Sequence, residues 1–146
     1  TTQRLKTIEK LAESGIPVNA MLAPIIPGIN SHELMGLARA VADAGAMSFG
    51  LNVVRLNGAI GEIFTHWIHK AMPERAEKVL NQIRSCHGGT LNDSRFGIRN
   101  KGEGPLARQI HRMAEICRKQ YFSGRGFPAL NTELHQEYKT GQLKLF

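Results

Sequence analysis

The sequence has 146 residues, little cysteine and no long apolar run. Its two cysteines, Cys86 and Cys117, are far apart and lack CxxC spacing, which is typical of reduced thiols in a cytoplasmic protein. No run approaches the roughly 20 apolar residues that span a bilayer, so no membrane partner is expected. The chain also lacks an initiator methionine, an apolar signal segment and a cleavage pattern. We interpret its beginning as an internal point of a longer protein.

Positive charge is concentrated in one part of the chain. The formal net charge is +7, with 42% hydrophobic and 21% charged residues, and this composition is ordinary for a soluble globular domain. Residues 84–126 hold nine Lys/Arg against three acids, whereas residues 1–83 hold eight against seven. This excess favours a polyanion or phosphate partner. A solvated helix face beside an Arg-rich loop would give the same charge.

The stretch 18–33, VNAMLAPIIPGINSHE, reads as strand, tight loop and helix. An apolar run of six residues suits a buried strand, and two prolines and a glycine then exclude a helix across the turn. Ser31 or Asn30 is the expected N-cap of the helix that follows. In parallel α/β proteins such a loop lies at the carboxyl end of the sheet, where ligands bind. We therefore interpret residues 25–30 as the wall of a binding site.

The order of elements predicts an α/β fold with a parallel sheet. Helix, glycine and strand alternate twice, which is typical of βα units. Strands are expected at about 17–24 and 47–56, and helices at 2–14, 31–44, 62–72, 74–86 and 105–118. Two strands alone do not make a stable parallel sheet. The missing strands would come from an absent N-terminal region, or the exposed sheet edges would pair copies of the chain.

The predicted organisation has three parts. Residues 1–58 would form the βα units, residues 59–122 a helical extension with a basic loop at 88–104, and residues 123–146 a polar tail.

Four segments together resemble a known family. They are RLKTIEKLAESGIPVNAMLAPIIPGINSHE, AGAMSFGLNVVRL, IFTHWIHKAMPERAEKVLNQIRSCHGG and DSRFGIRNKGEGPLARQI. In this order they resemble the C-terminal half of radical S-adenosylmethionine (SAM) proteins, and more narrowly the spore photoproduct lyase-like (DNA repair photolyase-like) group. The resemblance covers nearly all of the chain except about the last twenty residues. It implies the fifth and sixth strands of a partial (β/α)6 barrel, followed by a C-terminal extension.

The resemblance also implies two cofactors, SAM and a 4Fe–4S cluster. The family holds its cluster with three thiolates of a CxxxCxxC motif. Cys86 and Cys117 do not match that spacing, so neither the cluster nor reductive cleavage of SAM is expected from this chain alone. We interpret the chain as an inactive fragment whose partner is the missing N-terminal half.

Carried over residue by residue, the resemblance implies part of a SAM site. The loop after the fifth strand places Ile26, Pro27 and Gly28 against adenine, with Asn30 as a polar contact, and the sixth strand adds Asn52. Prolines and a glycine can bring rigid, partly bare backbone to a flat ring. The same residues also make an ordinary tight βα turn.

Several polar and aromatic residues have two interpretations. Arg55, near the end of the second strand, suits a carboxylate or phosphate, or an ion pair with an acid such as Glu62. The HxxH pair at 66 and 69 has no third ligand in the sequence and does not predict zinc. Phe64 and Trp67 are expected in the core rather than in a stacking platform.

The loop DSRFGIR at 93–99 is the centre of the basic region. Arg95 and Arg99 are candidate phosphate or substrate contacts, and an interleaved Phe can stack on a base. Alternatively the loop seals the side of the barrel and Asp93 pairs with Arg95 or Arg99. Three functions follow: half of a radical SAM enzyme, a basic nucleic-acid-binding module without catalysis, and an α/β half-barrel with incidental charge.

Overall fold

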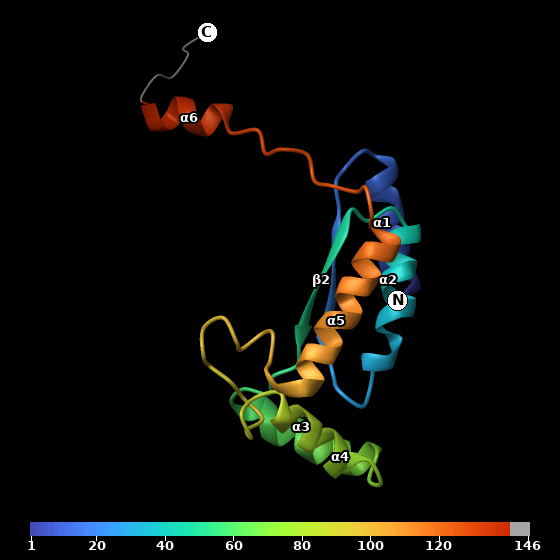
Figure 1. Ribbon diagram of the computed structural model, residues 1–146, viewed down its shortest axis with the longest axis vertical. Helices are drawn as coiled ribbons and strands as arrows, with labels where there is room; N and C mark the ends of the chain where they lie inside the picture. Colours follow the sequence, from blue (N-terminus) through green and yellow to red (C-terminus); the bar gives the residue numbers. More distant parts are fainter. Residues whose placement is uncertain (141–146) are drawn as a thin grey trace.

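A computed structural model describes residues 1–140, without the side chains of Leu134 and Thr140. In this part the chain forms six α-helices, one short 3₁₀ turn and a two-stranded parallel sheet that is not closed into a barrel (Figure 1). In chain order the elements are α1 (Thr2–Glu13), β1 (Asn19–Ile25), η1 (Ser31–Glu33), α2 (Leu34–Asp43), β2 (Ser48–Val53), α3 (Ala59–Ala71), α4 (Ala76–Ser85), α5 (Gly104–Tyr121) and α6 (Glu133–Thr140).

The two strands form one βαβ unit with α2 as the crossover. The register pairs Asn19 with Ser48 and Leu22 with Leu51, and it shifts before Ile25. The α/β class and the two parallel strands are confirmed, with both strands shorter than predicted. β1 includes Pro24 because, within residues 1–140, only β2 pairs with it, and proline is tolerated in an edge strand.

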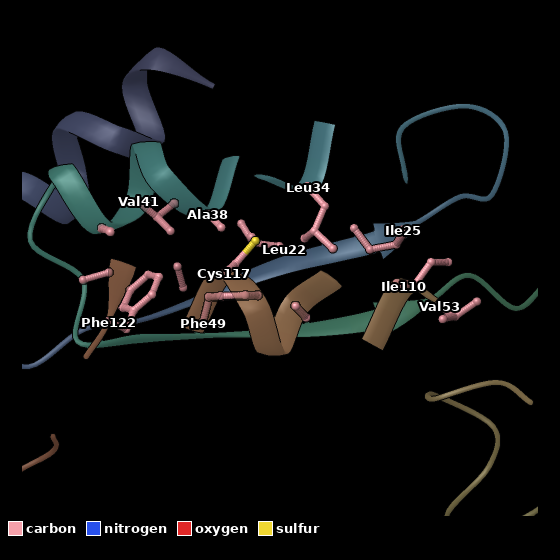
Figure 2. Packing of buried hydrophobic residues seen from close by; sticks show 14 of the residues in the cluster. Leu22, Ile25, Leu34, Ala38, Val41, Phe49, Val53, Ile110, Cys117 and Phe122 are labelled. Atoms are coloured by element: carbon pink, nitrogen blue, oxygen red, sulfur yellow. The ribbon is translucent and has the colours of Figure 1, made fainter. Parts of the chain in front are cut away.

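The larger core lies between one face of the sheet and the helices α2 and α5 (Figure 2). Strand residues alternate between two faces, so every second side chain meets the helices. We call this core the first cluster. The sheet contributes Leu22, Ile25, Phe49 and Val53. Helix α2 contributes Leu34, Ala38 and Val41, and α5 with the residue after it contributes Ile110, Cys117 and Phe122. Each large buried aliphatic side chain contributes about 1.5–3 kcal/mol relative to its exposed state.

A second cluster lies at the carboxyl end of the strands. Val54 and Leu56, just after β2, pack against α3 and α4. The helix expected at 74–86 is confirmed as α4, and its buried residues are Ala76, Val79, Leu80 and Ile83. This cluster holds the two helices beneath the loops that leave the sheet.

The other face of the sheet carries no helix (Figure 1). We call it the open face; its residues are Asn19, Met21, Ala23, Ser48, Gly50 and Asn52, and all six are exposed or half-buried. Met21 lies across Gly50, where an added Cβ would meet the Met21 methyl carbon at 3.2 Å. The open face therefore consists of small and polar side chains around one methionine.

The tail contains an element that the sequence did not predict. Helix α6 projects from the body at the end of an extended segment (Figure 1). Arg125 fixes the start of that segment, because its guanidinium donates to the carbonyl oxygens of Ala42 at 2.8 Å and Ala46 at 2.7 Å. Among residues 1–140, none of the helices is both long and apolar enough to cross a membrane.

Candidate functional site at the carboxyl edge of the sheet

The loop after β1 is closed by its own asparagine. Asn30 accepts a hydrogen bond from the Ile26 amide at 2.7 Å and donates one to the Pro24 carbonyl at 3.0 Å. Asn30 does precede η1, as a cap would, but its side chain makes no capping bond. The Asn30 side chain, for which the family resemblance implies a polar contact with SAM, thus binds the loop backbone.

The rest of this loop packs against α4. Pro27 is fully buried, and Ile26 packs on the second cluster. Gly28 has φ +77°, and a Cβ there would overlap the Gln82 side chain. Arg75 donates a hydrogen bond to the Gly28 carbonyl. The structure therefore brings Ile26, Pro27 and Gly28 together beneath a helix.

Asn52 lies elsewhere, on the open face near the end of β2. It is half-buried and lies close to where the register with β1 becomes irregular, between Leu22 and Ile25. Of the five residues proposed for SAM, Asn52 is the one on the open face.

Arg55 does not pair with Glu62 in the described structure. Its guanidinium instead donates to the carbonyl oxygen of Asp93 at 3.2 Å. The carboxyl end of β2 is thereby joined to the basic loop, 38 residues later in the chain.

Residues 87–103, which we call the closing segment, cross the end of β2. Besides the bond from Arg55, four hydrogen bonds hold it there or close its ends. His87 Nε2 lies 2.7 Å from the Val54 carbonyl oxygen, and the other three bonds join Val53 N to Asn100 O, Leu56 N to Leu91 O and Glu103 N to Cys86 O at 2.8–2.9 Å. Backbone groups that would face solvent at a free strand edge are satisfied in this way.

A charged cluster fixes the inside of the closing segment. Asp93 is buried and accepts hydrogen bonds from the Arg95 guanidinium at 2.6–3.2 Å, and Arg95 also meets Glu103 at 2.5 Å. The hydrogen bonds from Arg95 lower the pKa of Asp93 to about 2. The two carboxylates in turn raise the pKa of Arg95. The predicted pairing of Asp93 with Arg95 is observed, and Arg95 is engaged by two acids.

His87 is a buried polar residue of this edge that sequence reasoning did not single out. Its side chain is completely buried, and its Nδ1 has no hydrogen-bond partner while lying 3.9 Å from Asp93 Oδ2. The one local signal was a polar residue directly before Gly88-Gly89, at the end of a helix with an apolar face. The carbonyl that it meets is 33 residues earlier, and no local pattern identifies such a partner.

Of the two aromatic residues expected in the core, Phe64 packs on the second cluster, whereas Trp67 is 45% exposed and that prediction is wrong. Phe96, in the basic loop, is 92% exposed. Phe96 therefore seals nothing within residues 1–140. His69 lies 3.3 Å from Glu77 rather than forming a site with His66.

No family model, curated protein or solved structure matches this chain.

Proposed function

We propose that this chain is the C-terminal half of a cytoplasmic radical SAM enzyme of the spore photoproduct lyase-like group. In this proposal the sheet is the fifth and sixth strands of a partial (β/α)6 barrel, and the N-terminal half of the same protein is its partner. The chain alone would be inactive.

The open face is the observation that carries the proposal. A sheet in a two-layer domain with water on one side has polar side chains there, and a sheet inside a core has large apolar ones. The open face lacks the large apolar side chains of a sheet inside a core, because Asn19, Ser48 and Asn52 are polar and Ala23 and Gly50 are small. Small residues let a ligand approach the backbone closely, which suits the inner wall of a barrel that holds one.

The described residues do not fit an iron–sulfur cluster. Cys86 and Cys117 are both fully buried among apolar side chains, and burial raises the pKa of both thiols. Residues 1–140 contain no group of three His, Cys, Asp or Glu side chains arranged to hold a metal ion. The three thiolates that the family requires would have to come from the N-terminal half.

The described residues would form only one side of a SAM site. We assign Asn52 a hydrogen bond to the nucleoside, because its amide is on the open face near the carboxyl end of β2. The 26–30 loop would border the site through its shape, since Asn30 closes it and α4 supports Gly28. The cofactor itself supplies the radical precursor when bound, and these residues bind and orient it.

The first test is the coding sequence upstream of Thr1. The proposal requires an in-frame CxxxCxxC motif there. An uninterrupted upstream sequence that encodes no such motif would reject it.

The second test measures SAM binding by equilibrium dialysis on the protein that contains both halves. Asn52→Ala should weaken binding roughly 2- to 12-fold, which corresponds to one hydrogen bond. Asn19→Ala is the matched control, because Asn19 is on the same open face at the opposite end of the strands. If the two variants weaken SAM binding equally, Asn52 is not part of the SAM site.

A further inference from the structure

Four cations belong to the end of the closing segment and the first half of α5. Arg99 and Lys101 come from the closing segment, and Arg108 and Arg112 are one turn apart on the helix. All four side chains are exposed, and within residues 1–140 none of them forms an ion pair with a carboxylate. They are available to an external anion.

The segment and the helix form one surface. His111, between the two helix arginines in sequence, has its Nε2 2.8 Å from the Lys101 carbonyl oxygen. Figure 1 shows the loop projecting from the body beside the first turns of α5. A shallow groove of about 660 Å³ runs along this part of the helix, lined by Pro105, Arg108, Gln109, His111, Arg112 and Glu115.

Nearby acids offset part of this positive charge. Asp93 and Glu103 share Arg95, so that cluster has a net charge of −1. Glu115 is the one acid among the groove residues in the described structure. The four cations outnumber these two uncompensated negative charges, so the surface has a positive net charge.

The closing segment also carries an exposed aromatic ring, that of Phe96, three residues before Arg99. Phe96 is 92% exposed, and the turn that carries it is closed by a hydrogen bond from Arg99 N to Arg95 O at 3.0 Å. Arg95 is itself fixed by two carboxylates. The Phe96 ring is thus exposed to solvent on a hydrogen-bonded turn, three residues before Arg99.

We propose that this surface, Phe96 with Arg99, Lys101, Arg108 and Arg112, binds single-stranded nucleic acid. The cations contact phosphates, and an unpaired base stacks on the Phe96 ring. Aromatic rings next to a basic groove bind single strands in this way with little sequence preference. Bases in a duplex are already stacked, so an exposed ring favours a single strand. The proposal does not depend on the radical SAM assignment.

The test measures fluorescence anisotropy of a labelled oligothymidylate with the 146-residue chain, and repeats it with a duplex of equal length. The single strand should bind more tightly than the duplex. Phe96→Ala should weaken single-strand binding roughly 5- to 150-fold, the range for loss of one stacked base, and Phe96→Trp should retain it. Arg108→Ala with Arg112→Ala should reduce the slope of log affinity against log salt by about 1.4, or about 0.7 per phosphate contact.

Two control variants test whether any loss of positive charge, or of any exposed aromatic ring, weakens binding. Lys6→Ala with Lys10→Ala removes the same charge from exposed positions of α1, and Phe127→Ala removes another half-exposed aromatic ring. Both should bind as the unchanged chain does. Circular dichroism of every variant shows that the fold is retained, since all these side chains are at the surface.

Four results would each overturn the proposal. They are no binding at low salt, equal loss in the α1 control, duplex binding as tight as single-strand binding, and full binding by Phe96→Leu, which keeps an apolar but not an aromatic side chain. Tighter binding to anionic vesicles than to the oligonucleotide would assign the surface to lipid instead.

Discussion

His87 Nε2 lies 2.7 Å from the carbonyl oxygen of Val54, the residue that directly follows β2. Both groups are buried, and the bond joins the end of α4 to the end of the sheet. The Asp93–Arg95–Glu103 cluster lies on the other side of the same ring. The carboxyl edge of the sheet is therefore held by the His87 contact and by the ion-paired cluster of Asp93, Arg95 and Glu103.

We expect His87→Leu to lower the free energy of unfolding by about 1–3 kcal/mol. Leucine retains most of the volume but leaves the Val54 carbonyl buried without a donor. Urea denaturation followed by circular dichroism measures the change. His66→Leu, at an exposed position of α3, should stay within about 0.5 kcal/mol. Similar losses for the two variants would show that the Val54 contact contributes no stability.

Gly104→Ala should destabilise the protein more than Gly15→Ala. Both glycines have φ near the left-handed region, +81° and +73°, so alanine is strained at each by about 1–2 kcal/mol. A Cβ at Gly104 would also come within 2.8 Å of the Ser85 carbonyl oxygen, whereas one at Gly15 meets no atom within 4 Å. Thermal unfolding of the two variants compares them directly, and equal melting temperatures would contradict the close approach of Gly104 to α4.

The Asp93 carboxylate should make stability depend on pH in the acid range. Its pKa is about 2 in the folded chain against an ordinary value of 3.8, so the folded state favours the ionised form. The contribution is complete above about pH 4 and is lost as pH falls from there towards 2. Unfolding free energies across this range should fall less steeply in Asp93→Asn than in the unchanged chain. Asp43→Asn, at an exposed pair on α2, is the control and should not flatten the profile.

The open face and the free edge of β1 should make the chain self-associate. Met21 is 59% exposed on that face, and in the described structure β1 pairs with β2 alone. Unpaired strand edges and exposed apolar side chains favour association. Light scattering after size exclusion should show an average mass that rises with concentration, and Met21→Lys should reduce the rise. A monomer at every concentration would contradict this expectation.

Regular elements were predictable from the sequence because their signals are local. The apolar face of α4 recurs at helical spacing, and the two strands are short apolar runs bounded by glycine or proline. Asn30 was recognisable as a residue that begins a helix, but its hydrogen bonds to Ile26 and Pro24 depend on how the loop folds back. Of the two expected caps, Ser31 lies inside the 3₁₀ turn and Asn30 precedes it, and the Asn30 side chain makes no capping bond.

The closing segment could not be predicted for a different reason. Its bonds join residues that are 33 and 38 positions apart, from His87 to Val54 and from Arg55 to Asp93. Sequence spacing carries no information about such pairs. The same holds for Trp67 and Phe96, whose exposure depends on which elements cover them.

Arg125 fixes the tail at the end of the molecule opposite to the 26–30 loop. It binds the carbonyls of Ala42, in the last turn of α2, and of Ala46, in the loop that leads into the amino end of β2. Helix α6 leaves from that end, whereas α3, α4 and the closing segment lie at the other (Figure 1). A fluorophore coupled at Tyr138 would therefore report on the tail from a remote position, and it would leave the groove beside α5 free for an unlabelled ligand.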